Sequence, residues 1–169
     1  ITPANKVDEI KKLVIRIVNI EEFSTILTLN DISPVEASGA PVFNTNPYLK
    51  LNGRGVLVGV IDTGIDYLNK EFQMEDDTTR IVRLWDQTIQ GDTNIYGLKY
   101  GTEYTEEQIN QAISLQTSGG DPYSIVPSKD EIGHGTKVSG IIGGRGINPD
   151  LKGAAPDCKF VIVKLSRAT

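Results

Sequence analysis

Asp62 and His134 are of the residue types, and stand in the chain order, that proton-transfer chemistry uses. Asp62 directly follows the apolar run of residues 56–61, and His134 is the only histidine in the chain. Histidine exchanges a proton near neutral pH, and a neighbouring aspartate fixes its tautomer and stabilises its charged form. The two residues therefore predict a general base that activates a hydroxyl nucleophile, provided that the fold brings them together.

Each of these residues also has a plainer interpretation. In the Asp62-Thr63-Gly64 turn, the carboxylate would bind nearby backbone amides, and His134 would cap a helix or lie on the surface. The same turn matches the core of aspartic proteases, but the apolar run and the α/β pattern after it disfavour their all-β fold. Gly133-x-Gly135 matches part of a dinucleotide-binding loop, but Val138 stands where the third glycine is needed.

Three apolar segments would form the strands that position this chemistry. Residues 56–61 form a continuous apolar run, which is typical of a strand buried on both faces of a parallel sheet. Further strands are predicted at 80–85 and 158–165, and Cys158 at the start of the last one is a predicted core residue. Residues 86–103 are rich in polar and turn residues and predict a loop, and residues 30–53 predict a surface connector.

Two helices are predicted between the strands. Thr105 and Gln108 form a capping-box pattern at the start of the first, and its apolar face is Ile109, Ala112 and Ile113. The second helix begins at His134, presents Val138, Ile141 and Ile142 on one face, and ends at Gly143-Gly144. The alternation of strands and helices indicates an α/β fold with a mostly parallel sheet and flanking helices.

Composition excludes several classes of protein. The 169 residues are 38% hydrophobic and 23% charged, which excludes a disordered chain, and no apolar run is long enough for a membrane-spanning helix. A formal net charge of −5 disfavours nucleic acid as a partner. One cysteine and one histidine exclude a disulfide framework and a thiolate or multi-histidine metal site.

Three motifs, in the right order, resemble those of the subtilisin-like serine proteases. Residues 58–66 (VGVIDTGID) resemble the aspartate motif, residues 133–140 (GHGTKVSG) the histidine motif, and residues 153–156 (GAAP) the segment after the histidine helix. Residues 85–89 and 100–105 resemble the long insert of clostridial Csp-type proteases, here at about 86–130. The resemblance implies a partial subtilisin-like fold in which Asp62 and His134 belong to an Asp-His-Ser triad.

The chain departs from the family pattern most clearly at the nucleophile. No Gly-Thr-Ser-x-Ala motif, which carries the family's serine, occurs in the 169 residues, and Lys137 replaces a second histidine that is common in the family. We therefore expect the N-terminal part of a serine endopeptidase, inactive by itself, that acts on protein or peptide substrates. We also expect it to self-associate or to associate with the C-terminal part of the protease. The alternative is an inactive, pseudoprotease relative that works as a binding protein.

The resemblance carries further expectations about organisation and setting. Residues 1–33 are expected to be a propeptide tail or N-terminal extension, and residues 34–169 the N-terminal portion of the catalytic domain. The chemistry requires no cofactor. Family members often bind structural calcium, but Asp76, Asp77 and Asp150 match no ligand spacing, which favours a solvated acidic loop. The family resemblance suggests a secreted or spore-associated setting, and no contact with a membrane is expected.

Overall fold

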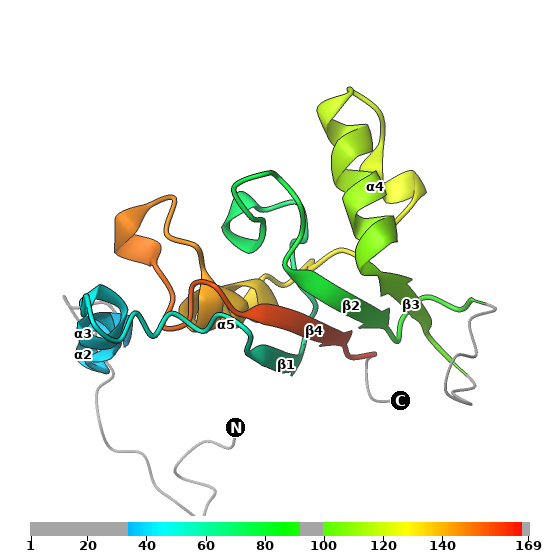
Figure 1. Cartoon of the computed structure of the whole chain (residues 1–169). Helices are drawn as coiled ribbons and strands as arrows, with labels where there is room; N and C mark the ends of the chain where they lie inside the picture. Colours follow the sequence, from blue (N-terminus) through cyan, green and yellow to red (C-terminus); the bar gives the residue numbers. More distant parts are fainter. Residues whose placement is uncertain (1–33, 92–99, 167–169) are drawn as a thin grey trace, which may run out of the picture. The chain divides into compact units, whose positions relative to one another are not determined.

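The computed structural model describes residues 34–91 and 100–166, and they form a four-stranded sheet with helices on one face (Figure 1). The strands are β1 (Leu57–Asp62), β2 (Ile81–Asp86), β3 (Thr102–Thr105) and β4 (Lys159–Lys164), in the order β1-β4-β2-β3. The β4 strand pairs in parallel with β1 and β2, whereas β3 pairs antiparallel with β2. The predicted α/β fold with a mostly parallel sheet is confirmed.

The longest of the described helices, α4 (Glu106–Thr117), begins as its sequence predicts. Thr105 accepts a hydrogen bond from the backbone of Gln108, and the Gln108 side chain accepts one from the backbone of Thr105. This reciprocal capping satisfies two backbone amides that a helix start would otherwise leave unpaired. The predicted apolar face is also confirmed, because Ile109, Ala112 and Ile113 are buried.

The second long helix, α5 (His134–Gly143), begins at His134 and ends before Gly144 as predicted. Val138 and Ile142 of its predicted apolar face pack against the core, but Ile141 does not. Ile141 is 48% exposed, and the fully buried positions are Gly135, Ser139 and Gly143. A side chain on Gly143 would collide with Phe160 of β4 and with Cys158, which directly precedes that strand. The helix therefore approaches the sheet too closely for large residues, and small residues at a spacing of four face the strands.

Two loop predictions are wrong in part. Within the predicted connector of residues 30–53 the chain forms two short helices, α2 (Pro34–Ala37) and α3 (Ala40–Thr45). Proline suits the first turn of a helix, where the amide that it lacks has no partner, and Pro34 and Pro41 both lie in the first turn of their helices. The predicted 86–103 loop ends in β3, which the polar Thr102–Thr105 segment forms by pairing with β2. Within the described ranges, the short 3-10 helices are η2 (Lys70–Phe72), η3 (Pro122–Ser124) and η4 (Pro149–Leu151).

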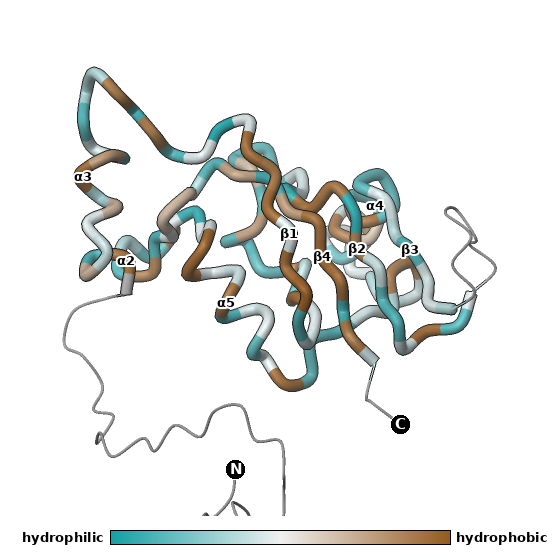
Figure 2. Tube along the Cα trace, turned by 90° about the horizontal axis from the view of Figure 1, so that it is seen from below, coloured by the Kyte–Doolittle hydropathy of each residue, from teal (hydrophilic) through white to brown (hydrophobic). Residues whose placement is uncertain are grey.

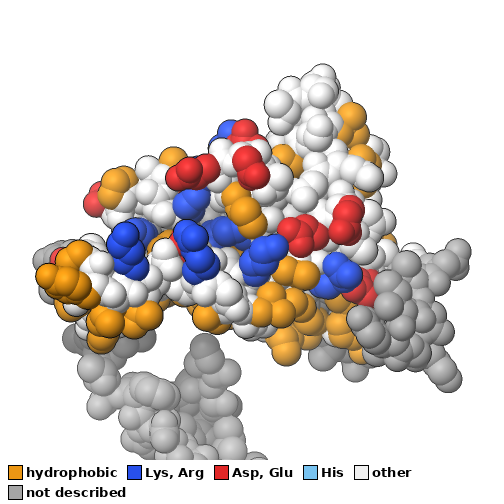
Figure 3. Space-filling model, viewed as in Figure 1, with side chains coloured by type: hydrophobic (Ala, Val, Ile, Leu, Met, Phe, Trp, Pro, Cys, Tyr) orange, Lys and Arg blue, Asp and Glu red, His pale blue; other side chains and the backbone are white. Residues whose placement is uncertain are grey.

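The sheet buries one face and leaves the other open. Burial alternates along the strands, so that Val60, Phe160, Ile162 and Leu84 lie in the core with Cys158 nearby, as predicted for that cysteine. On the other face, Leu57 and Ile61 of β1 are 57% and 66% exposed, so the prediction that this strand is buried on both faces is wrong. In Figure 2 the four strands lie side by side, and in Figure 3 hydrophobic side chains gather along the lower side of the molecule.

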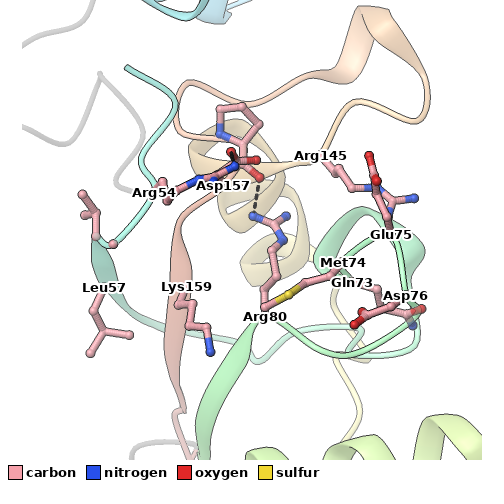
Figure 4. Close-up of a pocket in the computed structure, with 13 residues that line it drawn as sticks. Arg54, Leu57, Gln73, Met74, Glu75, Asp76, Arg80, Arg145, Asp157 and Lys159 are labelled. Atoms are coloured by element: carbon pink, nitrogen blue, oxygen red, sulfur yellow. Dashed lines mark hydrogen bonds and ion pairs between the residues drawn. The ribbon is translucent and has the colours of Figure 1, made fainter. Parts of the chain in front are cut away.

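A buried arginine directly before β2 joins it to the segment before β4, to η2 and to the end of α5. Arg80, only 3% exposed, donates hydrogen bonds to the carbonyls of Pro156 and Cys158, at 2.6 and 3.0 Å, and to those of Glu71 and Gly143. Figure 4 shows it at the wall of a cavity of about 650 Å³ that Leu57 and Lys159, the first residues of β1 and β4, also line. This cavity lies at the N-terminal ends of β1 and β4, whereas Asp62 lies at the C-terminal end of β1.

Residues 7–29 alternate between apolar and polar side chains, which predicts one or two short half-buried strands. These residues and the predicted propeptide tail of residues 1–33 lie outside the described residues. The division of the chain at residue 34 therefore stays a prediction. No described helix combines the length and hydrophobicity that crossing a membrane requires.

Candidate active site

Asp62 and His134 lie together at the C-terminal ends of the parallel strands. Asp62 is the last residue of β1, and His134 is the first residue of α5. The His134 Nδ1 atom lies 2.8 Å from Asp62 Oδ1 and 2.9 Å from Oδ2. Functional groups of open parallel sheets typically gather there, because the strands present their carboxyl ends to a common crevice. The structure thus brings together the two residues that the sequence singles out.

The geometry of the pair fixes the proton on one ring nitrogen. An ionised carboxylate only accepts hydrogen bonds, so the two short distances place a proton on Nδ1, and in the neutral ring the lone pair is then on Nε2. The His134 side chain is 65% exposed, whereas that of Asp62 is only 18% exposed. The imidazole therefore has one nitrogen held by the protein and one that faces outward.

Asp62 is held in its ionised form. The hydrogen bond from His134, followed by one from the backbone amide of Thr63 at 2.7 Å, lowers the pKa of Asp62 below its ordinary value. Burial opposes this shift but is weaker, because the carboxylate stays close to solvent. A permanent negative charge beside Nδ1 is what an imidazole needs when it accepts a second proton at Nε2.

A second aspartate, Asp130, organises the start of α5. Its Oδ1 accepts hydrogen bonds from Gly133 N and Thr63 Oγ1 at 2.9 and 2.8 Å. Its Oδ2 accepts from Thr136 N and Thr136 Oγ1 at 2.9 and 2.6 Å. Burial raises the pKa of Asp130, but these hydrogen bonds, those from Thr136 foremost, outweigh it and lower the pKa to about 2.

Asp130 also joins the two segments that carry the pair. Thr63, directly after Asp62, donates to Asp130 and accepts a hydrogen bond from Gly135 N at 2.9 Å. Thr136 in turn accepts from the amide of Asp66 at 2.9 Å. The turn after β1 and the first turn of α5 are therefore locked to each other on either side of the Asp62–His134 contact.

The sequence interpretation missed Asp130. Its signal is an acidic residue just before a helix start, where carboxylates bind the unpaired amides of the first turn. The helix has no side-chain cap at Gly133, whose φ of 80° suits glycine, so Asp130 takes that role from three residues upstream. The plainer interpretation of His134 as a capping residue does not hold, because its Nδ1 binds Asp62.

Glycine at position 135 lets the helix come close to the turn after β1. A side chain on Gly135 would collide with the carbonyl oxygen of Gly64 and come near Asp62. Gly135 is buried in this contact, so any larger residue would push His134 away from Asp62. The glycines on either side of His134 thus have distinct roles: one turns the chain and the other allows close packing.

A cavity of about 770 Å³ opens beside the pair. Asp62, Thr63 and Lys164 line it at the strand ends, together with the exposed Ile61 and the hydrophobic Leu165. The loop before α5 also lines it, through Lys129 and Ile132. The space beside Asp62 is thus lined by both apolar and charged side chains.

Two of the three candidate calcium ligands, Asp76 and Asp77, bind other side chains. Asp77 forms an ion pair with Lys70, with 3.1 Å between Nζ and Oδ1, and Asp76 accepts a hydrogen bond from Thr78. Across the described ranges, no three His, Cys, Asp or Glu side chains lie close enough to hold a metal ion. The solvated acidic loop stays the preferred interpretation.

Comparison with known proteins identifies the family. Residues 53–169 match the model of the subtilase family, peptidase S8. The chain is 28% identical over 164 residues to a PII-type proteinase of Lacticaseibacillus paracasei, a match that covers 89% of this chain and 8% of that protein. Among solved structures it is similar to the CspB protease of Clostridium perfringens, with 34% identity and a TM-score of 0.62 over 78% of this chain.

The chain spans only a small part of these relatives, since the match with the CspB protease covers 25% of that protein's chain. The family match covers more than half of the present chain, including β1, α5 and β4 with both Asp62 and His134. This chain belongs to the subtilase family.

Proposed function

We propose that the chain is the Asp/His part of a subtilisin-like serine endopeptidase, which hydrolyses peptide bonds. The observation that carries this proposal is the contact of His134 Nδ1 with both oxygens of Asp62. The family of the chain and the protease names of its relatives agree with it. The third member of the triad is a serine that lies outside these 169 residues.

In the proposed mechanism, His134 Nε2 takes the proton of the serine hydroxyl as its oxygen forms a bond to the substrate carbonyl carbon. Asp62 keeps the proton on Nδ1 and stabilises the imidazolium that results. Nε2 then gives its proton to the leaving amine as the carbon–nitrogen bond breaks, and an acyl-enzyme remains. Water repeats the sequence, with Nε2 as the base, and releases the carboxylic acid. All proton transfers use side chains, and the scheme requires no cofactor.

The open face of the sheet supports the expectation of a partner. Leu57 and Ile61 are each more than half exposed there, and β1 is an outermost strand of the described sheet. Uncovered apolar side chains forgo roughly 1.5–3 kcal/mol each relative to burial. We infer that the remaining part of the protease covers this face and that, without it, copies of the chain associate there.

A covalent inhibitor tests the proposal. A phosphonylating reagent that reacts with activated serines should label a protein that contains this chain together with the downstream family serine. The His134→Ala and Asp62→Ala variants should lose labelling, while Lys137→Ala, on the same turn of α5, should keep it. Wild-type protein that carries the serine motif but resists the reagent would contradict the proposal and favour the alternative of an inactive binding protein.

A further inference from the structure

Three charged residues form a row across the C-terminal ends of three neighbouring strands, where the candidate active site lies. Asp62, Lys164 and Asp86 are the last residues of β1, β4 and β2, and Lys164 is the register partner of both aspartates. Register partners in a sheet project to the same face. The ammonium of Lys164 therefore comes from a strand that lies between those carrying the two carboxylates.

Asp86 is the buried member of this row. Its side chain is 0% exposed, and its Oδ1 accepts hydrogen bonds from Thr88 N and Thr88 Oγ1 at 2.8 and 2.6 Å. Its Oδ2 accepts one from Ser128 Oγ at 2.6 Å and lies 3.5 Å from Lys164 Nζ. A buried carboxylate persists only when partners of this kind replace water, so Asp86 is firmly held.

Through Ser128, Asp86 reaches the segment that starts α5. Ser128 is 1% exposed and stands two residues before Asp130, whose hydrogen bonds hold Thr63, Gly133 and Thr136. The bond from Ser128 to Asp86 thus fixes the loop 126–130 to the end of β2. Movement of this loop would carry Asp130 and the first turn of α5 with it.

Asp86 is also the ion-pair partner of Lys164, whose strand lies next to β1. The Lys164 side chain is 13% exposed, and its stem packs against Gly64, two residues after Asp62. An ammonium so enclosed needs a carboxylate partner. Asp86 supplies it, and Asp62 is the other carboxylate at the same register.

We propose that Asp86 is a positioning residue for the Asp62–His134 pair: it anchors the loop that carries Asp130 and holds Lys164 away from Asp62. This inference rests on the proposed function, because it assigns a role in setting up the same pair. Without the charge of Asp86, Lys164 turns to Asp62 and competes with His134 Nδ1 for the carboxylate.

The single histidine makes a direct spectroscopic test feasible. In the full chain labelled with ¹⁵N-histidine, the two ring nitrogens of His134 report which of them carries the proton. The wild-type chain should show the Nδ1-protonated tautomer. Asp86→Asn, which is nearly the same shape, should shift both signals toward a mixture of tautomers while the rest of the amide spectrum stays folded. Asp86→Asn with wild-type ring signals would overturn the proposal.

Two further variants separate the two contacts. Adding Lys164→Met to Asp86→Asn should restore the wild-type ring signals, and a double variant that remains altered would contradict the role given to Lys164. Ser128→Ala should also shift the ring signals, and it serves in place of Asp86→Asn if that variant does not fold. A folded Ser128→Ala chain with wild-type ring signals would contradict the anchoring role.

Ser139→Ala is the matched control, since Ser139 is a buried serine of α5 whose hydroxyl has no hydrogen-bond partner among the described residues. The ring signals of His134 should not change in this variant. The readout needs no nucleophilic serine. Failure of hydrolysis and failure of this positioning role are therefore observed separately.

Discussion

His134 Nδ1 lies 2.8 Å from Asp62 Oδ1 although 72 positions of the chain separate the two residues. The contact joins the end of β1 to the start of α5, and two further hydrogen bonds run beside it, from Gly135 N to Thr63 and from Thr63 to Asp130. The pair is therefore part of a built arrangement in which the carboxylate, the imidazole and their two backbone segments are fixed together. In the proposed function, this arrangement prepares Nε2 to act as a base before any substrate binds.

Removing the imidazole should raise the pKa of Asp62. The hydrogen bond from His134 is the largest cause of the lowered pKa, so His134→Ala should move it toward the ordinary value of 3.8. The amide of Thr63 still donates in the variant, and part of the shift should therefore remain. Carboxyl ¹³C NMR titration measures the change, with Lys137→Ala as a control. An unchanged titration of Asp62 would mean that the contact is not formed in solution.

The pH dependence of stability should reveal Asp130. Its pKa is lowered in the folded state from 3.8 to about 2, so the carboxylate stabilises the fold above pH ~4, and this contribution disappears as the pH falls through about 2. Asp130→Asn should lower the free energy of unfolding by ~1–2 kcal/mol at neutral pH. It should also make the free energy of unfolding depend less on pH at acid pH. Denaturant unfolding from pH 2 to pH 7 measures both effects. Asp150→Asn, at an exposed aspartate, should change neither, and equal behaviour of the two variants would refute this role.

Close packing at the start of α5 predicts opposite effects for two glycines of the same helix. Gly135→Ala should destabilise the chain by ~1–3 kcal/mol, because its methyl group would collide with the carbonyl of Gly64. Gly140→Ala should be neutral or stabilising by up to ~1 kcal/mol, because a Cβ there meets open space and alanine favours helix. Thermal unfolding of the two variants is the measurement. Similar melting temperatures for both would contradict the packing described.

The open sheet face should make the isolated chain associate. Sedimentation velocity of the 169-residue chain should show species larger than a monomer that grow with concentration. Ile61→Lys should weaken this association, because it places a charge on the open face. Val42→Lys, on α3, is a matched control because both side chains are 66% exposed. A wild-type chain that stays monomeric and melts cooperatively would show that the open face needs no partner.

The elements with strong local signals could be predicted from the sequence. Apolar runs marked β1, β2 and β4, and the Thr105–Gln108 capping box marked the start of α4. The order of the aspartate and histidine motifs also indicated which two side chains to bring together. These features depend on residues within one element or on a motif with a fixed spacing.

The parts that could not be predicted depend on contacts between elements. The polar β3 is a strand only because β2 lies beside it, and the small residues of α5 face the sheet because Phe160 leaves no room for larger ones. Asp130 acts on amides of two separate segments, which no local pattern shows. The apolar run of β1 predicted burial on both faces of the sheet, but one face is exposed. Burial on both faces requires a covering layer that the described residues do not provide.

The central claim is that His134, held by Asp62, is the general base of a serine peptidase, and hydrolysis of a peptide substrate tests it most directly. The measurement compares the 169-residue chain with a longer chain that continues through the family serine motif. We predict turnover by the longer chain only, and a loss of at least about 10³-fold in kcat in its His134→Ala variant. Turnover by the 169-residue chain, or a longer chain whose kcat is unchanged by His134→Ala, would contradict the account.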